Sequence, residues 1–334
     1  RYYLQSLIDQ KLIYHQEGNW QSRPEQIRSF LQERQGRSFT AVLEGFNEAE
    51  RRILRKSAVF QRAFNLNALG WILERTGENV NPAILPGLLD RALSTALLSV
   101  DSQRLYAFRD HALRIALKGE LEDEDRQDTH RAIAAFLETE VMPGSPDAVY
   151  DVAHHEEQAG DLDAALKHYE EAARLKDDGH FNSPQAQIYF NLAVGVLDRM
   201  PAGSVDSQRE FELRYINLYY DYHVNPTKED VEARMEQLRL LAEGHRVRRM
   251  KYLTVRTAFY FFQGRRAEMS ESGEELLALK AGPEDEPHIV STYVLLGTTP
   301  LGKPYAERAE ILKQGLEKSL RCNRMDLLPP AMTV

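Results

Sequence analysis

Apolar residues recur every three to four positions along most of the chain, which is typical of helices that bury one face. One example is the set Ile133, Ala134, Phe136 and Leu137, which shares a face of the helix expected from Asp125 to Glu140. Strand-like segments are limited to two short hairpins. The pattern therefore predicts a mainly all-α protein with small β-hairpins.

Each expected hairpin has a short polar turn between apolar strands. The first is predicted over residues 12–20, with its turn at 17–19. The second is predicted over residues 97–108, with its turn at 101–103. Both therefore connect neighbouring antiparallel strands rather than parts of a larger sheet.

Three helices are predicted between the hairpins. The first begins after Asn47, which forms a capping-box pattern with Glu50 three residues later. The other two are expected at Leu66–Leu73 and Ile84–Leu98. Three helices followed by a two-stranded wing is the winged-helix order. We therefore expect a winged-helix domain and its following helix at residues 45–142.

The second half of the chain is predicted to consist of helix pairs separated by breaks rich in glycine, proline and aspartate. The clearest pair spans Val149 to Ala172, with small residues where the two helices would touch and Tyr169 as an aromatic plug. This pattern resembles tetratricopeptide repeats. More degenerate copies lie around 260–276 and 305–315. We expect an α-α superhelix of tetratricopeptide-like repeats at residues 147–334.

The amino-acid composition limits the kinds of molecule and compartment that suit this chain. Lys and Arg number 42 against 51 Asp and Glu, a net charge of −9, so no overall field favours nucleic acid or anionic membranes. The single cysteine, Cys322, excludes an internal disulfide and a thiolate zinc site, and it fits a reducing, cytoplasmic compartment. No run of about 18 uncharged apolar residues predicts a membrane span. Because the chain opens at Arg1 and ends without a helix cap, we expect further sequence on both sides.

Several ordered motifs within residues 1–175 carry a family resemblance. The stretch Tyr106–Arg114, reading YAFRDHALR, precedes a helix with Arg126, His130 and Ile133-Ala134. Together they resemble the winged-helix end of bacterial STAND signalling ATPases, of the type of maltose-activator-like regulators and kinase- or cyclase-linked predicted ATPases. Further similar stretches are Tyr3–Trp20, Ile53–Phe60 and Ala153–Asp161. The resemblance implies that residues 1–44 end an ATPase core, whose ATP or ADP and Mg²⁺ would bind upstream, with no cofactor in this segment.

The resemblance also implies a nucleotide-sensing site at Asp110, His111 and Arg114. In the family, a winged-helix histidine is thought to sense the β-phosphate of bound nucleotide. The usual order is His-Asp, whereas this chain has Asp110-His111. Adjacent helical residues point about 100° apart, so the reversal favours an alternative in which nucleotide is not sensed here.

No motif predicts catalysis or a metal site. Residues 297–304, reading GTTPLGKP, have phosphate-loop spacing, but Pro304 lacks the hydroxyl that would hold Mg²⁺. Gly297 and Gly302 fit better as packing and turn glycines of a helix pair. His154-His155-Glu156-Glu157 lacks the i, i+4 spacing of zinc-binding histidines. We expect that this segment is not an enzyme.

A basic run and an aromatic-rich stretch are the candidates for partner binding, because arginine and rigid aromatics dominate binding hot spots. The residues singled out are Tyr219, Tyr222, Arg246, Arg248, Arg249 and Tyr260. The acidic stretch Glu120–Asp128 follows the wing directly, which disfavours nucleic acid. A protein or peptide partner is therefore expected.

The leading hypothesis is a cytoplasmic regulatory segment of a bacterial STAND ATPase, in which repeats bind a partner and the winged helix couples this to nucleotide state and assembly into homo-oligomers. One alternative is a constitutive tetratricopeptide scaffold with a degenerate winged helix. Another is the regulatory region of a Ser/Thr kinase or nucleotide cyclase. A DNA-binding activator ranks below these, because the basic run lies far from the wing in sequence.

Overall fold

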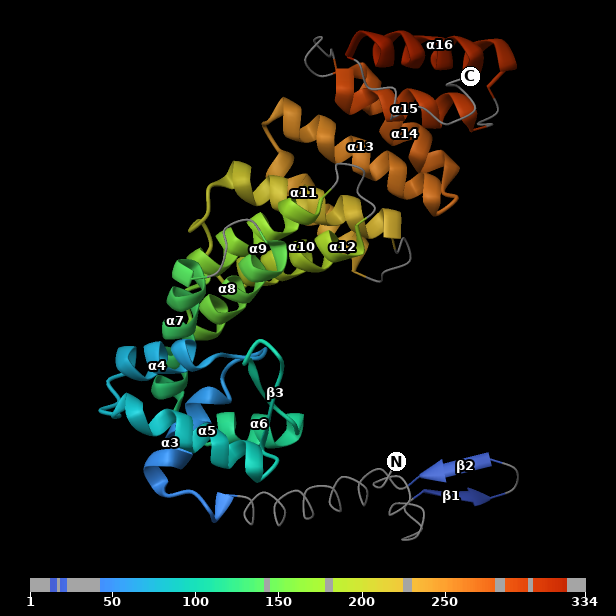
Figure 1. The fold of residues 1–334 in the computed structure, drawn as a ribbon. Helices are drawn as coiled ribbons and strands as arrows, with labels where there is room; N and C mark the ends of the chain where they lie inside the picture. The colour runs from blue at the N-terminus through green and yellow to red at the C-terminus, as the bar shows by residue number, and fades with distance from the viewer. Residues whose placement is uncertain are drawn as a thin grey trace. The chain divides into compact units, whose positions relative to one another are not determined.

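The computed structural model describes residues 43–140, 145–177, 183–224, 230–279, 286–299 and 303–322. Of residues 13–16, 19–22, 222–224 and 286–288, only the backbone is described. The described chain is mainly α-helical, with two small antiparallel sheets of two strands each, as the apolar spacing predicts (Figure 1). The all-α fold class is therefore confirmed.

The chain forms two compact units. The first comprises Arg1–Val141 with Gln158–Gly160, and the second comprises Met142–Glu157 and Asp161–Val334. The described elements that precede the second unit are β1 (Ile13–Gln16), β2 (Asn19–Ser22), α3 (Glu48–Ser57), α4 (Leu66–Arg75), η1 (Pro82–Ile84), α5 (Leu85–Ser94), β3 (Leu98–Val100), β4 (Tyr106–Phe108), α6 (His111–Gly119) and α7 (Asp123–Glu140).

Local polar contacts set the boundaries of these elements. The capping box before α3 is present, because Asn47 Oδ1 accepts from the Glu50 amide at 3.0 Å and the Glu50 carboxylate accepts from the Asn47 amide at 3.0 Å. In the turn of the second hairpin, Asp101 Oδ1 accepts from the amides of Gln103 and Leu105, each at 2.9 Å. This side chain holds the turn that the sequence predicts.

The predicted helix Ile84–Leu98 is too long. Helix α5 ends at Ser94, Ala96 has a left-handed φ of 58°, and Leu98 pairs with Phe108 in the β3–β4 hairpin. The apolar run Leu97-Leu98 continues the helical pattern in sequence, but both side chains are buried in the core of the unit, Leu98 from β3. Burial of the strand therefore overrides local propensity here.

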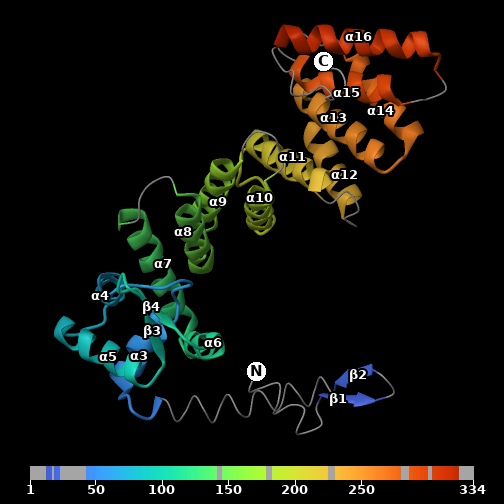
Figure 2. The ribbon, with the colours of Figure 1, turned by 45° about the vertical axis from the view of Figure 1, so that its right-hand side comes forward.

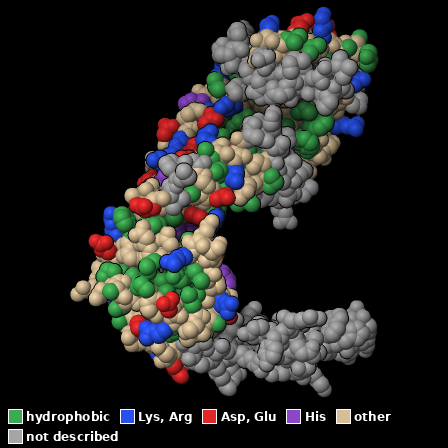
Figure 3. All heavy atoms as spheres, in the orientation of Figure 1, with side chains coloured by type: hydrophobic (Ala, Val, Ile, Leu, Met, Phe, Trp, Pro, Cys, Tyr) green, Lys and Arg blue, Asp and Glu red, His purple; other side chains and the backbone are tan. Residues whose placement is uncertain are grey.

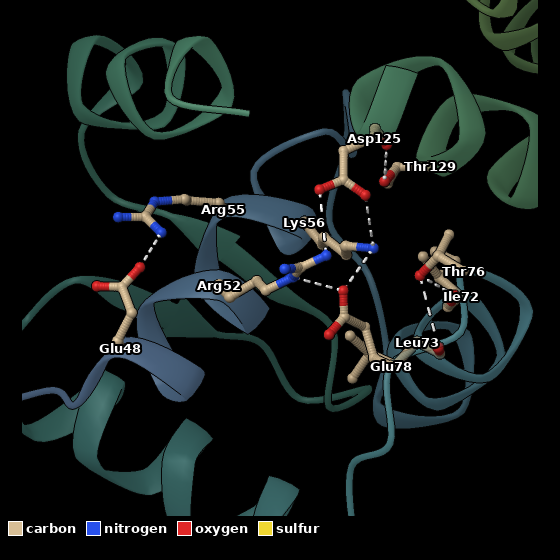
Figure 4. A network of polar contacts seen from close by, with 10 residues as sticks. All are labelled: Glu48, Arg52, Arg55, Lys56, Ile72, Leu73, Thr76, Glu78, Asp125 and Thr129. Carbon is tan, nitrogen blue, oxygen red and sulfur yellow. Dashed lines mark hydrogen bonds and ion pairs between the residues drawn. The ribbon is translucent and has the colours of Figure 1, made fainter. Parts of the chain in front are cut away.

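A buried ion-pair network connects three elements of the first unit (Figure 4). The side chain of Lys56, on α3, is fully buried, and its Nζ lies 2.7 Å from Glu78 Oε1 and 3.6 Å from Asp125 Oδ1. Arg52 contacts the same two carboxylates at 2.7 and 3.2 Å. Because a buried charge is tolerated only when paired, α3, the loop after α4 and α7 depend on one another.

The second unit is an array of helices (Figures 1 and 2). They are α8 (Pro146–Ala159), α9 (Leu162–Lys176), α10 (Pro184–Leu197), α11 (Ser207–Val224), α12 (Val231–Ala242), α13 (Arg246–Phe262), α14 (Arg266–Ala278), α15 (Glu286–Thr298) and α16 (Tyr305–Cys322). Its largest described cores lie in the α8–α11 and α11–α15 regions. Successive members from α9 onward pack against each other, and α8 shares a core with α9.

The helix pair α8–α9 is built as the repeat pattern predicts. Ala153 and Ala165 are fully buried, and Tyr169 is 1% exposed. Gly160, between the helices, has a φ of 85°, which favours glycine at the turn. Gly264 plays the same role between α13 and α14, with a φ of 69°. The small, aromatic and turn positions of the repeat pattern are therefore confirmed in α8–α9, and the turn glycine is confirmed in α13–α14.

Candidate functional site: a polar groove across three helices

The residues predicted to sense nucleotide lie at the start of α6. Asp110 is its N-cap, and its Oδ1 accepts from the amides of Ala112 at 2.8 Å and Leu113 at 3.2 Å. His111 is exposed, and its Nδ1 lies 3.4 Å from Arg114 Nη2. The Arg114 guanidinium also donates to the carbonyls of Phe60 at 2.9 Å and Ala58 at 3.3 Å, and its burial lowers the pKa of Arg114. Asp110 and Arg114 thus have structural partners in this unit, and nucleotide sensing stays a prediction.

The cap predicts a difference between two substitutions. Asp110→Ala should lower the free energy of unfolding of the first unit by about 1 kcal/mol, whereas Asp110→Asn should cost little, because Asn caps as well as Asp. Trp71 fluorescence during urea unfolding, in a Trp20→Phe background that removes the other tryptophan of the chain, measures both. Equal losses for the two variants would show that the charge of Asp110, not its cap, is what the unit needs.

The basic run predicted to bind a partner is largely occupied by contacts within the chain. Arg248 is only 6% exposed, and it donates to Gln208 at 2.8 Å, to Ser207 at 3.1 Å and to the Leu241 carbonyl at 3.1 Å. The Arg248 guanidinium thus joins α13 to α11 and α12, and its role in partner binding stays a prediction. Arg246 and Arg249 are exposed, and Arg249 pairs with Glu275 at 2.5 Å.

The predicted aromatic anchors lie on α11 and near the C-terminal end of α13. Tyr219 is half-buried against the core formed by α11–α15, and the side chain of Tyr222 lies outside the described residues. Tyr260 is half-buried, with the guanidinium carbon of Arg265 at 4.5 Å and that of Arg256 at 5.5 Å from its ring centre. Tyr260 lies fourteen residues after Arg246 on α13, a rise of about 21 Å. The two candidates thus lie at opposite ends of one helix.

A groove that the sequence does not reveal crosses α10, α11 and α12. It has a volume of about 450 Å³. Its lining consists of Asn191, Val194, Gly195 and Asp198 from the α10 side, Arg214 and Asn217 from α11, and Asp230, Arg234 and Gln237 from the α12 side. Three helices therefore contribute polar side chains to one concave surface.

The floor of this groove is a hydrogen-bonded network. Asn217 is 2% exposed, donates to Asn191 Oδ1 at 2.8 Å and accepts from Arg234. Arg234 also pairs with Asp221, a carboxylate that is 1% exposed and accepts from Gln187 at 2.7 Å. Buried polar groups satisfied in this way are held in fixed orientations. The groove is therefore preorganised rather than a gap between mobile side chains.

The lining of the groove has two positive and two negative side chains, and its arginine and asparagine side chains are rich in hydrogen-bond donors. Arg214 and Arg234 face Asp198 and Asp230, and Arg214 pairs with Asp198 at 2.8 Å. A guanidinium has five N–H donors and an Asn amide two, and the contacts among the described residues use only part of this capacity in Arg214, Arg234 and Asn217. Asp198 and Asp230 at the edge are exposed acceptors. The arrangement suits a ligand whose carbonyls face the floor and whose N–H groups face the edge.

Gly195 opens this groove. It lies inside α10, and a Cβ added there would meet nothing within 4 Å. Glycine in a helix interior costs about 0.5–1 kcal/mol relative to alanine, and no close contact within this chain accounts for that cost. The contributing side chains are too far apart in sequence to form a motif.

Charges elsewhere on the second unit do not form a large field of one sign. Figure 3 shows Lys and Arg interspersed with Asp and Glu on the visible face. Among the described pairs, Lys251 lies 2.7 Å from Glu212 and Arg265 lies 2.7 Å from Glu232. An extended phosphate backbone would find no continuous basic stripe on this face.

Comparisons with known proteins do not identify a family or a function for this chain. No family model and no curated protein matches the chain. A similar solved structure is that of a signal transduction ATPase with numerous domains (STAND) protein with a tetratricopeptide repeat sensor from Pyrococcus horikoshii, at 15% identity and a TM-score of 0.33. The match covers 86% of this chain and 47% of the other, so this chain spans about half the length of that protein. A likeness at this TM-score decides nothing about fold or function. Among the described residues, no helix has the length and apolarity needed to cross a membrane.

Proposed function

We propose that this chain is a regulatory, protein-interaction region whose helical array holds an extended segment of a partner protein in the groove across α10, α11 and α12. The observation that supports this most directly is the preorganised floor of Asn217 and Arg234, whose hydrogen-bonded side chains line a concave polar surface. An extended peptide presents carbonyls and N–H groups in alternation, which suits donors on the floor and carboxylates at the edge.

The lining disfavours other ligand classes. A phosphate group would meet Asp198 and Asp230 as well as the two arginines, so no net positive charge attracts it. A divalent cation would prefer converging oxygen ligands, whereas Arg214 and Arg234 are cations themselves. A segment with no net charge in the groove fits best.

In the wider protein, we propose that partner binding on the helical array is coupled through the first unit to a nucleotide-binding core of STAND type, in the cytoplasm. The support is the resemblance of the motifs within residues 1–175, together with the order of α3, α4, α5 and the β3–β4 hairpin, which agrees with the order expected for a winged helix. ATP or ADP with Mg²⁺ would then belong to the remainder of the protein, and this region would have no catalytic role.

Filling the groove tests the peptide site. Gly195→Leu places a side chain in open space within a helix, so we expect the fold to be kept and peptide binding to fall by about tenfold or more. The probes are peptides selected from a random-sequence display library on the unchanged protein, with affinities measured by calorimetry. Gly87→Leu is the matched control, since Gly87 also lies in a helix with nothing within 4 Å of an added Cβ. Failure to select any peptide, or equal affinity for both variants, would contradict the proposal.

A second candidate function, a constitutive scaffold, is favoured by the capping role of Asp110. If this carboxylate serves only to begin α6, the first unit has no phosphate sensor at the position that the family resemblance implies. The two functions are distinguished by the rate at which ADP is released from a protein that includes the proposed nucleotide-binding core. The rate is measured with and without a selected peptide. A peptide-dependent rate supports coupling, and an unchanged rate supports the scaffold.

A further inference from the structure

The first unit contains a larger hollow beside α4. It has a volume of about 810 Å³ and lies between α4 and the segment 77–85. Apolar walls come from Leu66, Trp71, Val80 and Pro82, and the polar part of the lining comes from Asn67, Glu74, Glu78 and Asn79. A volume of this size with mainly apolar walls is typical of sites for small organic molecules.

A glycine keeps this hollow open. Gly70 lies in the interior of α4 and lines the hollow, and a Cβ added at this position would meet nothing within 4 Å. Close packing therefore does not require glycine at this position, although glycine disfavours the helix. Its effect is to let a bound molecule approach the backbone of α4 between Leu66 and Glu74.

Trp71 forms part of the wall and has an unused donor. Its indole Nε1 is buried and has no hydrogen-bond partner among the described residues. Its ring has the Arg75 guanidinium carbon at 4.8 Å and the edge of Phe136 at 5.9 Å between ring centres. Because Nε1 is buried and the Arg75 guanidinium already lies over the ring, Trp71 contributes an apolar wall to the hollow and a reporter of what binds there.

The charged groups of the lining are all acidic. Glu74 and Glu78 line the hollow, and the lining contains no Lys or Arg. The Glu78 carboxylate is held by Arg52 and Lys56, whereas Glu74 is exposed. Glu74 is therefore the charged group of the lining that would meet a cationic ligand, while the nearby Arg75 guanidinium lies over the Trp71 ring.

We propose that this hollow is a binding site for a small organic cation, with an aromatic or apolar body against Trp71 and Pro82 and a protonated amine near Glu74. The site is separate from the peptide groove and gives the first unit an effector-binding role of its own. Gly70 provides the space, Trp71 the apolar wall and Glu74 the selection for positive charge.

The indole N–H resonances of the ¹⁵N-labelled protein test this site directly. The sequence has two tryptophans, so Trp20→Phe assigns the Trp71 signal. The probes are a panel of arylalkyl amines, each paired with the carboxylate of the same carbon skeleton. We expect amines to shift the Trp71 resonance in a saturable way, and the matched carboxylates to bind at least tenfold more weakly.

Three variants sharpen the result. Gly70→Leu should abolish the shift, and Gly87→Leu, a helical glycine outside the lining, should keep it. Glu74→Gln should leave binding of the apolar body but remove the preference for amines over carboxylates. No saturable shift with any amine, equal binding of amines and carboxylates, or a shift that persists in Gly70→Leu would overturn the proposal.

Discussion

Replacing Glu78 by alanine is expected to lower the free energy of unfolding of the first unit by about 3 kcal/mol or more. The reason is the ammonium group of Lys56, which is fully buried and lies 2.7 Å from Glu78. Without this carboxylate, the nearest remaining described anion is Asp125 at 3.6 Å, which also serves Arg52. A buried charge that loses its main partner is far more costly than an exposed one.

The reciprocal change should be much milder. Lys56→Met removes the buried charge together with its desolvation cost, and Glu78 keeps Arg52 at 2.7 Å and some access to solvent. Glu48→Ala is the surface control, because the Glu48 side chain, which pairs with Arg55, is 70% exposed. Urea unfolding followed by Trp71 fluorescence in the Trp20→Phe background measures all three. A loss for Glu78→Ala no greater than that for Glu48→Ala would show that the buried network contributes little.

The second large effect is expected at Gly297. Gly297→Ala should destabilise the α15–α16 pair by about 1–3 kcal/mol, because the added Cβ would lie 2.6 Å from Leu312 Cδ2 and 3.1 Å from the Arg308 carbonyl. Since a backbone oxygen is among the neighbours, the two helices must move apart. Gly195→Ala should have the opposite sign and stabilise α10 by about 0.5–1 kcal/mol, because its Cβ meets nothing.

Hydrogen exchange resolves the Gly297 effect locally. Faster exchange of amides in α15 and α16, with unchanged exchange in α8 and α9, is the expected pattern for an array in which neighbours stabilise one another. The result also distinguishes two readings of GTTPLGKP. If Gly297 belonged to a phosphate loop, Gly297→Ala would reduce ATP binding without loosening the helices. If Gly297 is a packing glycine, the substitution loosens α15 and α16. Helix α15 continues through Thr298, which favours the packing reading.

Local signals predicted much of the fold from sequence. The capping box at Asn47 and Glu50, the polar turn at Asp101 and the turn glycines Gly160 and Gly264 all act over a few residues, so their effects can be recognised without tertiary structure. Helical periodicity in the same way predicts which residues of α8 and α9 are buried. The error at α5 shows the limit, since Leu98 belongs to a strand only because the core of the unit buries it there.

The candidate sites were decided by tertiary structure. Arg248 has the sequence context of a surface cation, but neighbouring helices bring Ser207, Gln208 and the Leu241 carbonyl to it. The groove that holds Asn217 and Arg234 depends on how three helices cross, and its residues are spread over more than forty positions. Sequence periodicity and caps determined the helices and their turns, because those interactions are short-range. Only packing between distant helices decided which polar side chains converge, because that depends on contacts absent from any single segment.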